Sequence, residues 1–197
     1  MDFDAIILAG GRSSRLGGSP KSALMFDGAT LLERALAAAA GARHTVVVGP
    51  EPGGLPGGVL STREDPPFAG PAAAIAAGLA ALRSAGRSDL VLVLACDMPR
   101  VDDAVGVLLE ALPGAGADGV MAASADGRQQ PLAGFYSTAA LERAVQDAAA
   151  RNALVHGSVF ALLASLDVQA VVVPAGSTDD VDTWDDAAAL GVAVREQ

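Results

Sequence analysis

Apolar segments of strand length alternate with segments of helical periodicity along the chain, and this alternation constrains the fold more than any other feature. Uncharged apolar runs occupy residues 5–8, 45–48 and 90–94, and apolar residues at helical spacing follow them. Strands that are apolar on both faces are typical of a parallel sheet whose crossover helices cover both sides. The pattern therefore predicts a three-layer α/β fold with a mainly parallel sheet, which binds ligands beyond the carboxyl ends of its strands.

The remaining elements continue this pattern to the end of the chain. The 197 residues contain 51% hydrophobic and 18% charged residues, enough to bury one sizeable core, and neither a repeat nor a long linker divides them. We therefore expect one domain over residues 1–197. Strands are predicted near residues 59–60, 119–123, 131–136 and 168–173, and helices after Thr30, after Gly70-Pro71, and around residues 105–112, 141–145, 159–166 and 184–190.

Charge and cysteine content restrict the partners and the compartment. The chain has no run of about 18 apolar residues, and Asp2 and Asp4 stand where a targeting signal would be basic, so we expect an untargeted protein with no membrane partner. Cys96 is the single cysteine, which excludes an intramolecular disulfide and favours the reducing cytoplasm. A net charge of −10 argues against a nucleic-acid partner and favours a small ligand.

A glycine-rich loop follows the first predicted strand. Residues 8–17 read L-A-G-G-R-S-S-R-L-G, and Lys21 follows. Glycines let successive backbone N–H groups converge on an anion, and Arg15 and Lys21 add positive charge, which favours a polyphosphate ligand over a merely structural turn. Arg12 is a weaker candidate for the same role. Pro20 before the lysine excludes a P-loop, and the spacing of the glycines excludes a dinucleotide-binding fingerprint.

Lys21 has a further peculiarity, since it is the only lysine among 13 basic residues. An ammonium group is a compact point charge that fits where a planar guanidinium does not. The retained lysine is therefore a candidate for a specific chemical role, although chance would also explain it.

Aspartates follow the predicted strand at 90–94 and recur near the end of the chain. Asp97, at the carboxyl end of a central strand, is placed to hold Mg²⁺ against a phosphate. It would otherwise cap the next helix, although Asp102 and Asp103 look better placed for that. Asp182 either completes the metal site or belongs to the N-terminal cap of the last helix, with Asp182 or Thr183 as the capping residue. His44 and His156 are distant from these motifs in sequence and are interpreted as having no role in the site.

Five motifs occur in the same order as in the molybdenum-cofactor guanylyltransferase family, which this sequence resembles over residues 6–190. That family belongs to the nucleotidyltransferases with a Rossmann-like sheet, so the resemblance implies a Rossmann-like nucleotidyltransferase fold. The motifs are L-A-G-G-R-S-S-R-L-G-G-S-P-K at 8–21, E-D-P-P with G-P within 64–71, C-D-M-P at 96–99, Q-P-L at 130–132 and D-V-D-T at 180–183.

The resemblance also implies roles for individual residues. Cytidylyltransferase relatives tend to have alanine where this chain has Gly10, so Gly10 favours GTP. Many members have an asparagine that contacts the nucleotide where Gly49 stands here, so that contact is lost or supplied by backbone. Residues 128–130 would either face molybdopterin, the pterin substrate of that family, or form an exposed loop. Nucleotide contacts are implied for Leu8, Ala9, Gly10, Gly11, Lys21, Asp65 (base or ribose) and Asp97, with Asp97 also binding Mg²⁺.

The implied reaction is Mg²⁺-dependent transfer of GMP from GTP to molybdopterin or its molybdenum-bound form. Lys21, Arg15 and Asp97 would be the catalytic residues, and transient contacts with other molybdenum-cofactor proteins are expected. Two alternatives remain open. One is a cytidylyl- or sugar-phosphate nucleotidyltransferase with the same loop, and the other is a nucleotide-binding protein without turnover.

Overall fold

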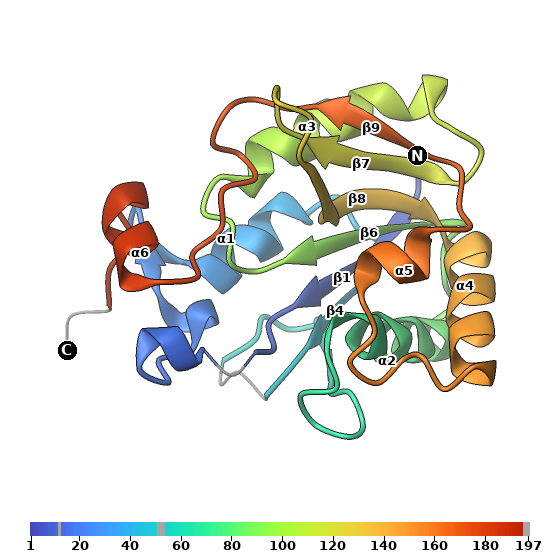
Figure 1. The fold of residues 1–197 in the computed structure, drawn as a ribbon, viewed down its shortest axis with the longest axis horizontal. Coiled ribbons are helices and arrows are strands. Elements are labelled where there is room, and N and C mark those ends of the chain that lie inside the picture. Colours follow the sequence, from blue (N-terminus) through green and yellow to red (C-terminus); the bar gives the residue numbers. More distant parts are fainter. Residues whose placement is uncertain (12, 51–53, 195–197) are drawn as a thin grey trace.

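The computed structural model describes residues 1–11, 13–50 and 54–194, and its central feature is a mainly parallel sheet (Figure 1). Five strands follow the order β5-β4-β1-β6-β8, in which β8 alone runs antiparallel to its neighbour β6. The parallel pair β7-β9 lies alongside β8 and extends the sheet. The strands are β1 (Phe3–Leu8), β4 (Thr45–Val48), β5 (Leu60–Thr62), β6 (Leu90–Ala95), β7 (Gly119–Ala123), β8 (Gln129–Ser137) and β9 (Val168–Val172).

Two apolar cores lie on opposite faces of the sheet, which confirms the three-layer α/β fold. In β1, Ala5 and Ile7 face one core, whereas Ile6 and Leu8 face the other, because successive side chains of a strand point in opposite directions. Both faces of this central strand are thus buried, as the apolar run at residues 5–8 predicts. The first core is covered by α1 (Leu31–Ala38) and α3 (Val101–Ala111), and the second by α2 (Pro71–Ala85), α4 (Thr138–Ala150) and α5 (Val159–Leu163).

A third apolar cluster joins the start of the chain to its end. Leu16 and Leu24, from the segment after β1, pack with Val181 and Ala187, all of them buried. This packing holds the glycine-rich segment against the C-terminal segment, although the two are about 160 positions apart. The elements concerned are the 3-10 helices η1 (Ser14–Leu16) and η2 (Lys21–Ala23), the hairpin β2 (Met25–Phe26) and β3 (Ala29–Thr30), and α6 (Trp184–Leu190).

The element bounds agree closely with those predicted from sequence, with a few corrections. The hairpin β2-β3 and the 3-10 helices η1, η2 and η3 (Leu112–Gly114) were not predicted, and α5 ends at Leu163 instead of near residue 166. Arg100 is the residue that precedes α3, so Asp102 and Asp103 lie in its first turn and do not cap it. Among the described helices, none has the length and apolar character needed to cross a membrane.

Candidate active site

A cavity of about 600 Å³ opens where the carboxyl ends of β1 and β6 meet the glycine-rich loop. Hydrogen bonds beyond the strand ends hold this edge together, since Ala9 N–H donates to Val48 O at 2.8 Å and Cys96 N–H donates to Leu8 O at 3.1 Å. The volume suits a ligand of nucleotide size. Its lining includes Leu8, Gly10, Gly11, Lys21 and Asp97 from the predicted set, and Ala9 lines an adjoining hollow.

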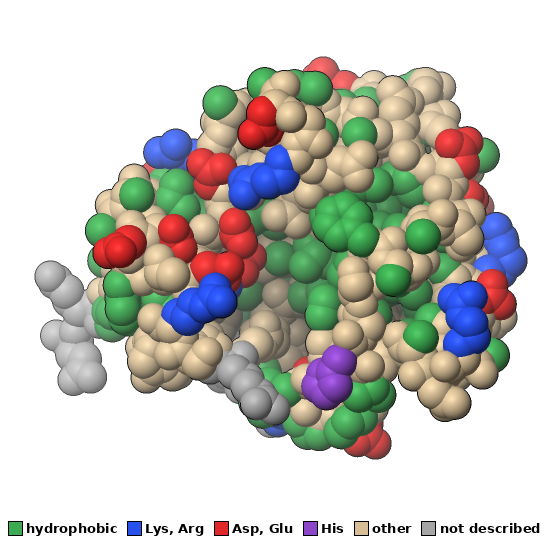
Figure 2. All heavy atoms as spheres, in the orientation of Figure 1, with side chains coloured by type: hydrophobic (Ala, Val, Ile, Leu, Met, Phe, Trp, Pro, Cys, Tyr) green, Lys and Arg blue, Asp and Glu red, His purple; other side chains and the backbone are tan. Residues whose placement is uncertain are grey.

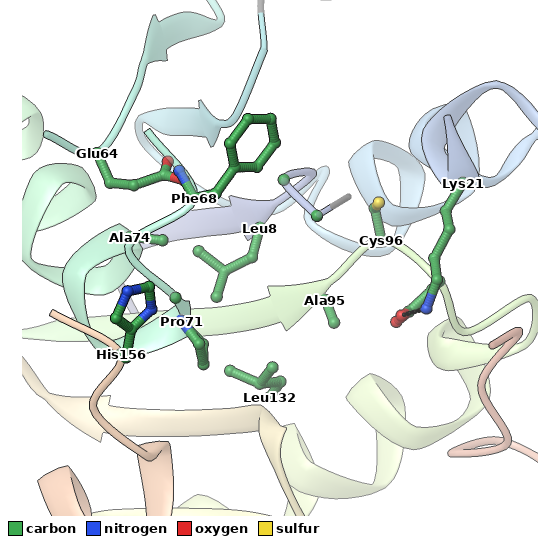
Figure 3. Close-up of a pocket in the computed structure, with 14 residues that line it drawn as sticks. Leu8, Lys21, Glu64, Phe68, Pro71, Ala74, Ala95, Cys96, Leu132 and His156 are labelled. Carbon is green, nitrogen blue, oxygen red and sulfur yellow. Dashed lines mark hydrogen bonds and ion pairs between the residues drawn. The ribbon is translucent and has the colours of Figure 1, made fainter. Parts of the chain in front are cut away.

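Lys21 lies at one end of this cavity (Figure 3), and its ammonium group contacts two carboxylates. It donates to Asp97 Oδ2 at 2.9 Å and to Asp182 Oδ1 at 2.5 Å. Burial by itself lowers the pKa of Lys21, but the charges and hydrogen bonds of the two aspartates outweigh burial and raise this pKa above its usual value. Lys21 therefore stays protonated and positively charged in the site.

Asp180 joins Asp97 and Asp182 in a group of three carboxylates, which offer ligand atoms within 4.8 Å of one another. Burial, together with the charges of Asp97 and Asp182, raises the pKa of Asp180. Crowded carboxylate oxygens are the donor set that Mg²⁺ prefers, so the residues fit this ion. Figure 2 shows acidic side chains gathered beside the central hollow, on the side toward α6. The sequence singled out Asp97 and Asp182 as metal ligands but not Asp180.

Two local features bring the C-terminal aspartates to Asp97. The third apolar cluster buries Val181 completely, and Val181 N–H donates to Asp97 O at 3.0 Å, so the residues on either side of Val181 lie at the rim. Thr183, in a capping box with Asp186, is the residue that caps α6. Of the two capping candidates, Thr183 is therefore the cap, whereas the carboxylate of Asp182 accepts a hydrogen bond from Lys21. The role of Asp182 as a metal ligand stays a prediction.

Other predicted site residues lie farther from this centre. Arg15 approaches Asp182 only to 4.0 Å, and 73% of its side chain is exposed. Arg12 lies outside the described residues. The structure does not bring Asp65 to the cavity, because its side chain lies in a separate surface hollow between the end of β5 and α2. The adjacent residue, Glu64, lines the cavity instead.

Gly10 and Gly49 approach each other closely at the cavity wall. A Cβ atom added to Gly49 would lie 2.8 Å from Gly10 N and 2.9 Å from Ala9 C, closer than real Cβ contacts. The backbone leaves no space for an asparagine at position 49 unless the loop shifts. The resemblance to the family therefore breaks down at Gly49 for a steric reason.

The two histidines lie in different surroundings. His44 contacts Asp4 at 3.1 Å, away from the cavity, and serves the structure as expected. His156 lines the cavity, contrary to expectation, and no motif marks it in the sequence. Burial raises the pKa of the Cys96 thiol, so Cys96 stays protonated and is no candidate nucleophile.

A second groove of about 610 Å³ adjoins the cavity and shares Pro71 and Leu132 with it. Residues 128–130 line this groove together with Phe160, whose side chain is largely exposed. Asp180 also lines it, so the carboxylate group stands between the cavity and the groove. The arrangement offers room for two ligands that meet at the carboxylates.

Comparisons with solved structures show the same fold. The chain is similar to molybdopterin-guanine dinucleotide biosynthesis protein A from Archaeoglobus fulgidus (20% identity, TM-score 0.66), with 95% of this chain and 96% of that chain covered. It is also similar to 2-C-methyl-D-erythritol 4-phosphate cytidylyltransferase from Thermus thermophilus (24% identity, TM-score 0.63), with 97% of this chain and 98% of that chain covered. The same enzyme from Francisella tularensis is 14% identical (TM-score 0.73), with 96% of this chain and 98% of that chain covered. Such low identities establish the fold and not the substrate.

A comparison with curated proteins gave no match. The sequence profile of the MobA-like NTP transferase domain matches residues 5–168, which comprise both the glycine-rich loop and the turn carrying Asp97. Together with the seven-stranded sheet and the cavity at its carboxyl edge, this match identifies the chain as a nucleotidyltransferase that belongs to the MobA-like NTP transferase family.

Proposed function

We propose that this protein transfers GMP from GTP to molybdopterin, or to its molybdenum-bound form, and releases pyrophosphate. The observation that carries the proposal is the Lys21 and Asp97 pair in the wall of the cavity, grouped with Asp180, which lines the groove. The cavity would hold GTP with its phosphates toward Lys21, and the groove would hold the pterin. Residues 128–130 would then contact the pterin, which is one of the two roles that the sequence leaves open.

In the proposed reaction an oxygen of the pterin phosphate attacks the α-phosphorus of GTP in line with the leaving group. A new P–O bond forms as the bond between the α-phosphorus and the bridging oxygen breaks, and pyrophosphate leaves with the electron pair. The second pKa of a phosphate monoester is about 6, so the attacking oxygen is mostly ionised at neutral pH and needs no general base. This agrees with a reaction centre built from Lys21 and carboxylates.

The residues would contribute mainly by positioning and by charge. Asp97, Asp180 and Asp182 would hold Mg²⁺, which when bound offsets charge on phosphate oxygens. The Lys21 ammonium would move from its carboxylate partners to the phosphates and stabilise the charge that develops on pyrophosphate. Arg15, exposed at the edge of the site, would assist at longer range. Leu8, Ala9, Gly10 and Gly11 would surround the nucleoside.

The proposal extends to the setting of the reaction. We propose that residues 1–197 form one nucleotidyltransferase domain and that this domain acts in the cytoplasm. It would have no nucleic-acid or membrane partner and would make transient contacts with other molybdenum-cofactor proteins. The acidic net charge of −10 supports a small-molecule substrate over a nucleic acid, because phosphate backbones are bound by basic surfaces.

One experiment separates this function from its rivals. The protein is incubated with Mg²⁺, each of the four NTPs labelled at the α-phosphate, and either molybdopterin or 2-C-methyl-D-erythritol 4-phosphate. We expect label from GTP alone to be transferred, and only to molybdopterin. Transfer of CMP to the methylerythritol phosphate would make the protein a cytidylyltransferase. Tight GTP binding without transfer to either acceptor would favour a binding protein without turnover.

A further inference from the structure

Glu64 places a buried carboxylate in the wall of the cavity. It lies between β5 and α2, and only 6% of the residue is exposed. Its Oε1 atom accepts a hydrogen bond from Phe68 N–H at 2.9 Å, whereas its buried Oε2 atom has no hydrogen-bond partner among the described residues. A carboxylate has about four acceptor positions, and leaving most of them unused in a buried place costs free energy. The side chain therefore favours a ligand that donates hydrogen bonds.

Glu64 and Lys21 lie at opposite ends of the row of residues that line the cavity (Figure 3). If the phosphates occupy the Lys21 end, the base of the nucleotide reaches the Glu64 end. The walls there are mainly apolar and include Leu8, Phe68 and Ala74. Such walls suit the flat faces of a nucleotide base, and Glu64 is the acidic group that could accept hydrogen bonds from the edge of that base.

The chemistry of the bases decides which one this carboxylate accepts. Guanine has two adjacent donors, N1–H and the exocyclic N2–H₂, along one edge. Adenine and cytosine have a single amino group next to a ring nitrogen whose lone pair would face the carboxylate. An acceptor-only group therefore favours guanine by attraction and disfavours the other two bases by repulsion.

Gly10 supports this interpretation by its position. A Cβ atom at residue 10 would lie 3.8 Å from Oε1 of Glu64, in ordinary contact. An alanine there would fit the protein but would crowd the approach to the carboxylate. The glycine that the sequence associates with GTP therefore lies beside the acceptor.

We propose that Glu64 determines the base specificity of this protein by accepting hydrogen bonds from the N1–H and N2–H₂ groups of guanine. This inference rests on the proposed function, because it takes the cavity as the GTP site. It deepens that function by assigning the choice of base to one side chain.

The test compares equilibrium binding of GTP, ITP, XTP and CTP, each with Mg²⁺, to the wild-type protein and to Glu64→Gln. ITP lacks the exocyclic amino group, and XTP has a carbonyl oxygen in its place. Wild-type protein is expected to bind GTP about tenfold more tightly than ITP, the usual cost of one lost bond to a charged group, and XTP should bind more weakly than ITP because its oxygen is repelled by the carboxylate. In Glu64→Gln the amide oxygen keeps the bond from Phe68 N–H, so the amide NH₂ group faces the ligand.

An NH₂ group facing the base repels the guanine donors and pairs with the xanthine oxygen. Glu64→Gln should therefore lose about tenfold in affinity for GTP and bind XTP more tightly than GTP. Glu110→Gln, the same chemical change at an exposed position on α3, should keep the wild-type order. A merely structural role for Glu64 would change stability, measured by thermal unfolding, but would not reverse the order of two nucleotides.

The results also separate this inference from the proposed function. If Glu64→Gln keeps the wild-type ratio of GTP to XTP affinity, Glu64 does not determine the base specificity, but a wild-type preference for GTP would still support the proposed function. If the wild-type protein prefers CTP, the guanylyltransferase proposal fails as well. A wild-type measurement with 1-methyl-GTP needs no variant, and equal binding of this analogue and GTP would overturn the N1–H contact even if Glu64→Gln fails to fold.

Discussion

The ammonium nitrogen of Lys21 lies 2.9 Å from Oδ2 of Asp97, although 76 positions separate the two residues in the chain. Lys21 begins the 3-10 helix after the glycine-rich loop, and Asp97 follows β6, the strand that pairs with β1. Each side chain is only 19% exposed, so solvent screens this pair less than it screens a surface ion pair. Each residue therefore fixes the position of the other, and replacing one alters the surroundings of both.

Replacing Asp97 with asparagine is expected to abolish turnover while the protein stays folded. A neutral amide of the same shape does not hold Mg²⁺ against polyphosphate. GMP transfer over a Mg²⁺ titration, with thermal unfolding measured in parallel, tests this. Asp147→Asn makes the same change at an exposed position of α4 and should leave transfer unaltered. Activity like wild type at saturating Mg²⁺ would remove Asp97 from the metal site.

Replacing Lys21 with arginine is expected to lose much of the activity although the charge is kept. The ammonium fits between Asp97 and Asp182, whereas a planar guanidinium is larger and would misplace its charge. The loss should approach the cost of one transition-state contact, about 3 kcal/mol or roughly a hundredfold in rate, and Lys21→Ala should lose more. Single-turnover kinetics with GTP and molybdopterin measure both variants. A rate within about twofold of wild type for the arginine variant would show that any cation suffices.

Replacing Asp180 with asparagine is expected to stabilise the metal-free protein at neutral pH. Burial beside Asp97 and Asp182 raises the pKa of Asp180, so the fold disfavours its charged form. Because its folded pKa is raised, the protonated carboxyl of Asp180 favours the folded state. This stabilisation is fully present below the unfolded pKa of 3.8, and it is lost as the pH rises through the higher folded pKa. The gain at pH 7 should be at most about 1 kcal/mol, because the side chain is partly exposed and screened.

Denaturant unfolding without divalent cations at neutral and acidic pH tests this expectation. The advantage of Asp180→Asn should disappear in acid, where the wild-type carboxyl is protonated, and it should shrink when Mg²⁺ is added to the wild type. A variant no more stable than wild type at neutral pH would show that the three carboxylates do not repel one another appreciably.

Replacing Gly49 with asparagine, the residue common in the family, is expected to destabilise this protein by about 1–3 kcal/mol, as overpacking does. The new Cβ atom would overlap the backbone of Ala9 and Gly10. Gly106→Ala is the matched control, because a Cβ at this position of α3 meets no heavy atom within 4 Å. That change should raise stability by about 0.5–1 kcal/mol. Urea unfolding that shows equal stability for Gly49→Asn and wild type would mean that the loop moves freely.

The sequence was sufficient to predict the sheet and one end of the site. Lys21 and Asp97 were identifiable because each follows an apolar run, and the carboxyl ends of neighbouring parallel strands meet at one edge. The hairpin β2-β3 was not, because strands of two residues are too short to show a periodicity. Strands and helices can thus be predicted from the sequence where burial imposes a pattern of apolar residues over several positions.

The base end of the cavity was not predictable in the same way. Motif comparison pointed to Asp65, whereas the structure places the adjacent Glu64 in the cavity wall. Outside regular strands and helices, the sequence has no periodicity of apolar residues that would predict which of two neighbouring side chains points inward. His156 lies in the segment between α4 and α5, and the course of this segment brings it to the cavity. No motif near His156 in the sequence predicts that position.

The carboxylates at the mouth of the cavity also influence how a nucleotide arrives. Asp97, Asp180 and Asp182 carry three formal negative charges against the charges of Lys21 and of the largely exposed Arg15, on a protein with a net charge of −10. A bare triphosphate is repelled during diffusion toward such a surface, and this repulsion weakens as salt screens it. A triphosphate that already carries its cation is less negative and approaches more readily. If the cavity binds a nucleotide as proposed, the acidic side chains should therefore slow the association of the free polyanion more than that of the metal-bound nucleotide.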